Sequence, residues 1–165
     1  MGVYSVDKLM TEARRLAAEY RKATGKPLAI SNEIALFDAA RLLDLEIPEA
    51  PESGYDTIGR GRREGLRIQI KARVLFDESK SGQRIGQLKL DKEWDLVILV
   101  LMDENYEPCE IYEAERSAIL DALDGQGNSQ RNRRGAMSIA RFRHISRLVW
   151  TREEGEITDE LWENR

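Results

Sequence analysis

The stretch "WDLVILVLMD", from Trp94 to Asp103, places the strongest constraint on the fold of this chain. A strand with one wet face alternates apolar and polar residues, whereas a continuous apolar run of this length is typical of a strand buried on both faces. The run is also much shorter than the ~20 apolar residues that a membrane-spanning helix requires. We therefore expect a central strand, in a sheet that other elements cover from both sides.

Two helices are predicted before the strands. The first covers residues 5–24, starts at Ser5 as its N-cap and ends at the "GKP" that follows. Its apolar stripe comprises Leu9, Ala13, Leu16 and Tyr20. The second helix is expected over about residues 32–44, with Ser31 as its N-cap. The two prolines of "EIPEAPESG" then indicate a loop.

The remaining elements complete an α/β pattern. We expect strands at about 55–58, at 66–76 and within "PCEIYEAE", a helix at 116–123, and a last helix that begins at Ser138. Helical spacing in that last segment is shown by Ile139, Phe142, Ile145 and Leu148. "DESKSGQRIGQLKLDKE" is polar and contains glycine, so we expect an irregular connection there. The predicted architecture is one domain, residues 1–165, with a central mixed sheet flanked by helices, residues 1–26 as an N-terminal helix, and an acidic tail at 151–165.

Polar side chains stand at unusual places in the hairpin "GYDTIGRGRREGLRIQIKARVLF", residues 54–76. Its second strand alternates, so the two faces carry Ile68, Ile70 and Ala72 on one side and Gln69, Lys71 and Arg73 on the other. A turn at residues 62–64 brings Asp56 opposite residues 68–71, where facing Cβ atoms are ~5 Å apart. The face that Asp56 takes depends on the register of the two strands.

A second acid is expected near this hairpin. Glu33 begins the second helix on the side that should dock on the sheet. The carboxylates of Glu33 and Asp56, the amide oxygen of Gln69 and the main-chain carbonyl of Ile70 would suit Mg²⁺ or Mn²⁺, because such ions prefer oxygen ligands. A bound metal ion lowers the pKa of its water and stabilises the charge that develops in phosphodiester hydrolysis. Lys71 would orient or deprotonate that water, or offset negative charge on the phosphate.

Composition excludes some chemistry and leaves nucleic-acid binding open. One cysteine and one histidine rule out an intrachain disulfide and a zinc site built from thiolates and imidazoles. The net charge of −4 argues against a generally basic surface, although basic residues gather in 57–75 and 129–147. The arginines expected to contact phosphates are Arg60, Arg62, Arg63, Arg73, Arg131, Arg133, Arg134 and Arg141.

The combination of Glu33, "GYD" at 54–56 and "IQIK" at 68–71 resembles the PD-(D/E)XK nuclease superfamily. That pattern has a helical glutamate, an aspartate on one strand and (D/E)-x-K on the next; Gln69 stands where the acid is usual, as in the Mrr-like restriction endonucleases. The chain also resembles a family of small bacterial proteins with the same "GYD…IQIK" hairpin.

The resemblance implies a restriction-endonuclease-like core of αβββαβ type and a Mg²⁺- or Mn²⁺-dependent endonuclease that acts on DNA in restriction or DNA processing. It further implies that Glu33, Asp56 and Gln69 bind metal, with Lys71 in catalysis. The chain start lacks the apolar block of a secretory signal, so a cytoplasmic location is expected. A homodimer would supply two sites, since one such site cuts one strand.

Plainer interpretations of the same residues stay open. Gln69 and Lys71 would also suit the wet face of an edge strand, Glu33 the helix dipole, and Asp56 a turn or a pair with a hairpin arginine. A nuclease-like fold without catalysis could bind nucleic acid or a protein, and an interaction protein could use the polar strand face for a partner chain. The sequence does not distinguish DNA from RNA.

Overall fold

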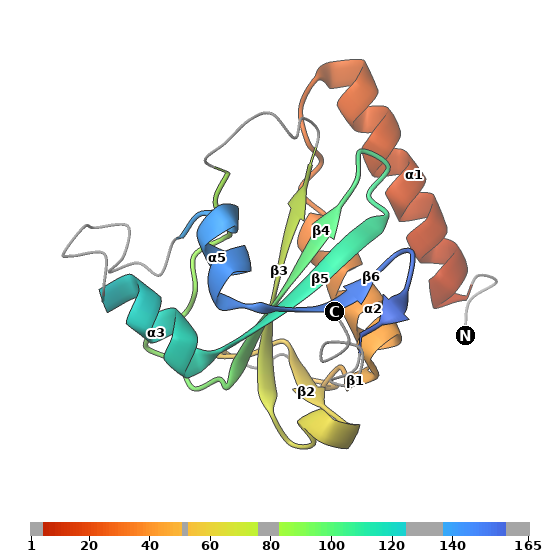
Figure 1. Ribbon diagram of the computed structural model, residues 1–165. Coiled ribbons are helices and arrows are strands. Elements are labelled where there is room, and N and C mark those ends of the chain that lie inside the picture. Colours follow the sequence, from red (N-terminus) through yellow and green to blue (C-terminus); the bar gives the residue numbers. More distant parts are fainter. Residues whose placement is uncertain (1–4, 51–52, 76–82, 125–136, 158–165) are drawn as a thin grey trace.

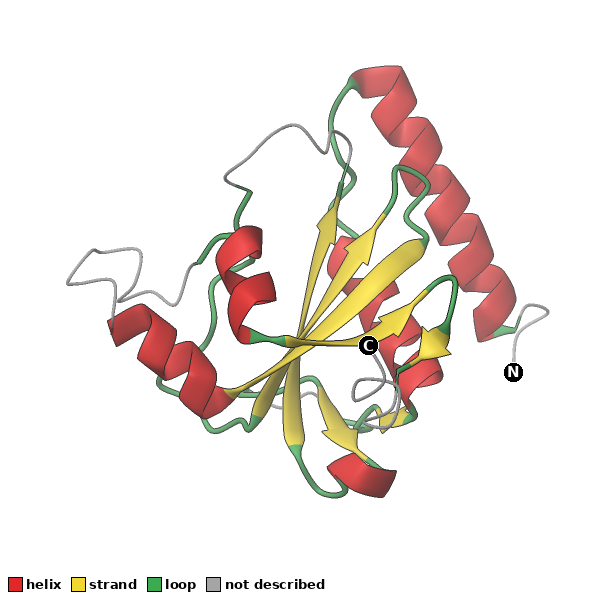
Figure 2. Cartoon of the chain, in the orientation of Figure 1, coloured by secondary structure: helices red, strands yellow, loops and turns green. Residues whose placement is uncertain are grey.

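A computed structural model describes residues 5–50, 53–75, 83–124 and 137–157. In these residues, seven strands form one mixed sheet, and four α-helices flank it (Figures 1 and 2). The strands lie in the sheet in the order in which they follow each other along the chain. The predicted α/β class with a central mixed sheet is therefore confirmed.

The helices are α1 (Val6–Thr24), α2 (Ser31–Leu43), α3 (Arg116–Asp124) and α5 (Ile139–Ile145), with a short 3₁₀ helix, η1 (Gly61–Arg63). The strands are β1 (Leu45–Glu46), β2 (Thr57–Gly59), β3 (Arg67–Val74), β4 (Leu96–Met102), β5 (Pro108–Glu115), β6 (Arg147–Thr151) and β7 (Gly155–Glu156). Strands β3 and β4 run parallel, and every other neighbouring pair is antiparallel.

Strand β4 is the predicted central strand, and every one of its residues is buried. Its side chains alternate between two cores. Leu96, Ile98, Val100 and Met102 join the core under α1 and α2, whereas Val97, Leu99 and Leu101 join the core under α3 and α5. A continuous apolar run is needed here because neither face of β4 meets water.

Helix α1 begins and ends as predicted but turns a different face to the protein. Ser5 caps its first turn, and Gly25 ends it at a φ of 74°. The buried side of the helix carries Arg14, which forms a bidentate ion pair with the fully buried Asp38 at 2.9 and 3.0 Å. This ion pair fixes the rotation of α1. The predicted stripe consequently points outward, with Leu9 51% and Leu16 58% exposed.

Several predicted boundaries were wrong. Ser31 is the first residue of α2 and not its cap, since Ile30 takes that place without a side-chain hydrogen bond. The short strand expected at 55–58 is Thr57–Gly59. The last helix ends at Ile145, and Leu148 belongs to β6, where it pairs with Tyr112. Residues 151–157, expected in an acidic tail, complete the β6–β7 hairpin, and Ile157 is fully buried.

The connection between β3 and β4 is irregular over residues 83–95, as expected. It covers the α5 side of the sheet, where Ile85 and Leu88 enter the second core. A backbone bridge joins Arg84 to Ser138 at the start of α5, and Ser138 caps that helix as predicted. In the part of the chain that the structure describes, no helix is long and apolar enough to cross a bilayer.

Candidate functional site

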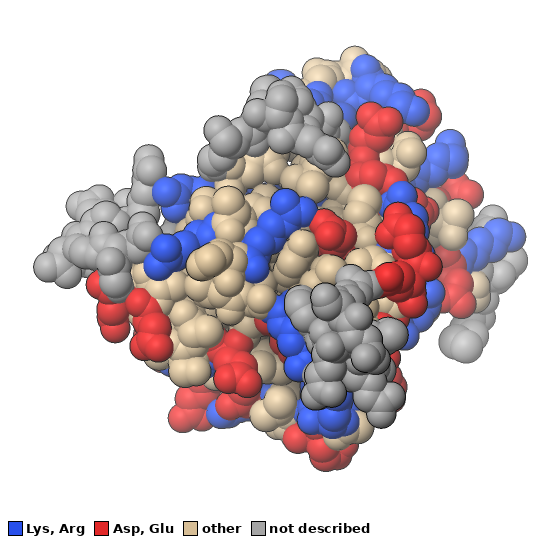
Figure 3. Space-filling view, viewed as in Figure 1, with Lys and Arg blue, Asp and Glu red and all other residues tan. Residues whose placement is uncertain are grey.

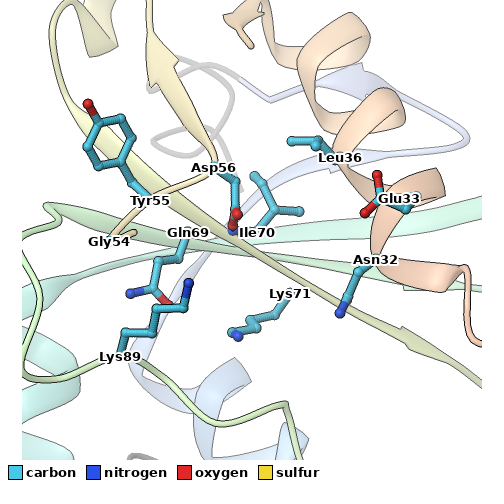
Figure 4. A pocket seen from close by; sticks show the side chains of 10 residues that line it. All are labelled: Asn32, Glu33, Leu36, Gly54, Tyr55, Asp56, Gln69, Ile70, Lys71 and Lys89. Atoms are coloured by element: carbon cyan, nitrogen blue, oxygen red, sulfur yellow. The ribbon is translucent and has the colours of Figure 1, made fainter. Parts of the chain in front are cut away.

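One pocket of about 250 Å³ is lined by the four predicted metal ligands and by Lys71, the predicted catalytic lysine. Strand β3 provides its floor with Gln69, Ile70 and Lys71, and the first turn of α2 provides one wall (Figure 4). The segment that leads into β2 provides another wall. The complete lining is Asn32, Glu33, Leu36, Gly54, Tyr55, Asp56, Gln69, Ile70, Lys71 and Lys89.

Asp56 is fixed by the hairpin backbone. Thr57 pairs with Ile68, so Asp56, the residue before Thr57, lies where the β2–β3 ladder ends. Its main-chain N–H donates to the Ile68 carbonyl at 2.8 Å, and its carboxylate oxygen Oδ2 accepts from the Ile70 N–H, also at 2.8 Å. The carboxylate therefore lies along the edge of β3, with Oδ1 left for a ligand. The sequence left the face of Asp56 undecided, and this register decides it.

Gly54 allows this close approach. A Cβ atom on residue 54 would lie 2.7 Å from the Glu93 carbonyl oxygen, a distance that real contacts do not reach. The "GYD" segment thus rests against the chain that enters β4. A glycine is required here by packing against backbone, which no local pattern in the hairpin could indicate.

Lys71 projects into the same pocket from the middle of β3. Its ammonium Nζ donates to the Gln87 carbonyl at 2.9 Å, which fixes the direction of the side chain. Burial lowers the pKa of Lys71 below its ordinary value, and the nearby Asp56 carboxylate opposes part of that shift. Asp56 and Lys71 therefore share one pocket, as the metal hypothesis requires.

Gln69 is the least satisfied polar side chain of the pocket. It is 2% exposed, and neither its amide oxygen nor its amide nitrogen has a hydrogen-bond partner among the described residues. An unsatisfied buried polar group costs about 1–3 kcal/mol, so native proteins seldom retain one without a purpose. A ligand in this pocket would give the Gln69 amide the partner that it lacks.

The oxygen atoms in the pocket are suitable ligands for a hard cation. Within a strand, the N–H and C=O of one residue point to the same side. Because the Ile70 N–H meets Asp56, the Ile70 carbonyl is directed toward the same edge. Glu33 and Asp56 add carboxylates, and Gln69 adds an amide oxygen. Mg²⁺ and Mn²⁺ prefer this set of oxygen ligands, and water would complete the coordination.

The acids of this pocket are few. Among the described residues, no three or more histidine, cysteine, aspartate or glutamate side chains gather as a metal cluster. Two carboxylates are enough for Mg²⁺, which usually keeps several waters. The neutral Gln69 makes the negative charge here smaller than three acids would give.

The hairpin arginines lie away from the pocket, at the turn beyond β2. Arg63 is only 4% exposed and pairs with Glu113 at 2.6 Å, so its guanidinium is not offered to a phosphate. Arg60 lies 3.4 Å from Asp44, and Arg62 lies 3.8 Å from Glu156. Acidic and basic side chains are interspersed on the face shown in Figure 3.

Of the five other arginines predicted to contact phosphates, two lie among the described residues and three do not. Arg73 lies two residues beyond Lys71 on β3, where its guanidinium donates to the carbonyls of Arg84 and Ala72. Arg141 is half-buried on α5, and its Nε has no partner among the described residues. Arg131, Arg133 and Arg134 lie outside the described residues.

Sequence reasoning missed two polar residues of this pocket, Asn32 and Lys89. Asn32 precedes Glu33 on the first turn of α2, so its place could have been inferred from that of Glu33. Lys89 comes from the irregular connection, and nothing in its local sequence separates it from its charged neighbours.

No protein-family model matches this chain, and no curated protein is significantly similar to it. The resemblance to the PD-(D/E)XK superfamily therefore stays a prediction, and the residues gathered in the pocket are the basis for any functional proposal.

Proposed function

We propose that this protein is a metal-dependent nuclease that hydrolyses phosphodiester bonds, with DNA as the expected substrate in restriction or DNA processing. The observation that carries the proposal is the convergence of Glu33, Asp56, Gln69, Ile70 and Lys71 on one pocket. The order of elements supports it: a helix with the glutamate, the aspartate directly before an antiparallel strand pair that carries Q-x-K, then a parallel buried strand. Residues 83–95 differ from the αβββαβ pattern, because no helix lies in that stretch.

The bound ion would supply an activated water and would stabilise the charge that develops on the phosphate. Glu33, Asp56, Gln69 and the Ile70 carbonyl would hold that ion. Lys71, whose pKa is lowered by burial, is suited to take a proton from the attacking water. The water oxygen then bonds to phosphorus while the P–O ester bond breaks, and the leaving oxygen takes a proton from solvent.

The direct test is cleavage of supercoiled plasmid DNA, with an RNA of similar length in parallel. Cleavage is expected with Mg²⁺ or Mn²⁺ and none with a chelator. A chain that binds either nucleic acid but never cleaves it would favour the second candidate, a nuclease-like fold without catalysis. The observation behind that candidate is the neutral Gln69 beside only two pocket carboxylates.

Gln69→Glu is expected to tighten Mn²⁺ binding at least about tenfold, because ligand charge sets the affinity of such sites. Without metal, the same variant should melt at a lower temperature than the wild type, since the removal of an ionised carboxylate from water is costly. Calorimetric titration and thermal melts with and without Mn²⁺ measure both effects. Asn105→Asp, on the exposed turn before β5, is the matched control. Unchanged Mn²⁺ affinity in Gln69→Glu would argue against an ion at this amide.

We also propose a homodimer, because one such site cuts one strand and two copies would supply two sites. The outward apolar residues of α1 repeat at alternating steps of three and four, which is the spacing of a two-helix seam. These residues are Val6, Leu9, Ala13, Leu16 and Tyr20.

Charge supports a second copy as the occupant of this seam. In an antiparallel pair that sets Leu9 against Tyr20 and Ala13 against Leu16, Lys8 lies about 3 Å along the axis from Glu19 of the second copy. Arg15 lies at the same axial distance from Glu12 of the second copy. Both salt bridges that these acids now make on α1 are exposed and can be exchanged.

The double variant Leu9→Glu/Leu16→Glu is expected to convert the dimer to a monomer, because it places charge in the seam. Sedimentation equilibrium measures the mass, and Thr11→Glu, exposed on another side of α1, should stay dimeric. Both leucines are largely exposed, so the fold should survive. A wild-type chain that sediments as a monomer at micromolar concentration would contradict the dimer.

A further inference from the structure

The irregular connection between β3 and β4 is held firmly around Lys89. On one side, Leu88 is almost fully buried. The Lys89 carbonyl itself accepts a hydrogen bond from the Trp94 indole at 2.8 Å. Beyond it, the Arg116 guanidinium donates to the carbonyls of Leu90 and Lys92 at 3.0 and 2.9 Å. Arg116 also stacks 4.5 Å above the Trp94 ring. The backbone that carries Lys89 is therefore fixed from both α3 and the core.

This anchoring places the Lys89 side chain at the pocket. Figure 4 shows it beside the Gln69 amide, on the opposite side of the pocket from Glu33. Lys71 lines the same pocket. Among the described residues, none accepts a hydrogen bond from the Lys89 ammonium or forms an ion pair with it. Lys71, in contrast, is already bound to the Gln87 carbonyl.

We propose that Lys89 binds a phosphate group of the substrate, adjacent to the phosphate that is cleaved. The inference rests on the proposed function and extends it by one substrate-binding residue. Glu33 and Asp56 would repel a polyanion, and Lys71 offsets neither of them when it acts as a neutral base. The Lys89 ammonium, for which the described residues provide no acceptor, adds a positive charge to the same pocket and would attract a phosphate group of the substrate. The irregular connection is then a functional part of the site.

The test measures binding and turnover separately. Binding of a fluorescent 20-base-pair DNA duplex is followed by anisotropy over a range of salt, with Ca²⁺ present so that binding is measured without turnover. Each phosphate contact contributes about 0.9 to the slope of log affinity against log salt. Lys89→Gln should therefore bind more weakly at every salt concentration, with a slope smaller by about 1. With Mg²⁺, it should raise KM and leave kcat almost unchanged.

Lys92→Gln is the matched control, since Lys92 is exposed on the same connection and does not line the pocket. It should keep the wild-type slope and KM. If the wild type cleaves DNA but Lys89→Gln has the wild-type slope and KM, the role of Lys89 is wrong and the nuclease stands. If the wild type never cleaves yet Lys89→Gln lowers the slope, the phosphate contact stands and the nuclease is wrong.

Discussion

Asp56→Asn is expected to lower the rate of Mg²⁺-dependent cleavage by at least about 100-fold. A metal ion contributes several kcal/mol of transition-state stabilisation, and each 1.36 kcal/mol corresponds to a factor of ten. The asparagine is nearly the same size, and its amide oxygen can still accept the hydrogen bond from the Ile70 N–H. The substitution therefore removes the charge that holds the ion while it preserves the hairpin.

Three measurements distinguish this effect from a loss of fold. The melting temperature of Asp56→Asn without metal should stay close to that of the wild type, whereas its Mn²⁺ affinity should fall steeply. Asp91→Asn removes a negative charge from the connection beside the pocket and should keep full activity. Normal Mn²⁺ binding and normal cleavage in Asp56→Asn would refute the proposed metal site.

Lys71→Met is expected to lower kcat by about 10²- to 10⁴-fold, the contribution usual for a positioned general base. Methionine fills a similar volume without an amine. Mn²⁺ affinity should not fall, because no ligand is removed and a positive charge leaves the pocket. A single-turnover cleavage assay measures the rate, and Lys26→Met, in the exposed turn after α1, is the control that should cleave at the wild-type rate.

The pH dependence separates two roles for Lys71. Burial lowers its pKa, so more of the amine is neutral at a given pH than in a free lysine. A base works only when neutral, and the wild-type rate should therefore rise with pH and level off above that lowered pKa. The residual rate of Lys71→Met should lack this rise. A wild-type rate that falls as pH increases through the same range would instead assign Lys71 as a cation that stabilises the phosphate, and the base role would be wrong.

Much of the site could be predicted from the sequence, because successive side chains of a strand point to alternate faces. Alternation along β3 places Gln69 and Lys71 on one face whatever surrounds them. A short turn also brings Asp56 near Ile70, and the hydrogen bond from the Asp56 N–H to the Ile68 carbonyl lies within the predicted range of 68–71. The hydrogen bond between the Asp56 carboxylate and the Ile70 N–H was not predictable, since it depends on where the ladder stops.

The arginines show that residue type predicts the position of a side chain less well than the alternation of faces along a strand does. Arg63 was expected at the surface beside a phosphate, but it is buried because Glu113 of β5 lies within 2.6 Å. Lys89, which was not singled out, lies at the pocket because Trp94 and Arg116 hold its backbone. Glu113 is 50 residues from Arg63, and Arg116 is 26 residues from Leu90, so local patterns carry no information about these partners.

The sequence by itself determined the buried run of β4, the alternating faces of β3 and the limits of α1, because each follows from short-range periodicity or from a cap. Only the tertiary structure decided which side of α1 is covered, where the last helix gives way to β6, and which charged residues meet at the pocket. The physical reason is that periodicity defines faces without choosing their partners. The ion pair of Arg14 with Asp38 turned the leucine stripe of α1 outward, and pairing with Tyr112 drew Leu148 into the sheet.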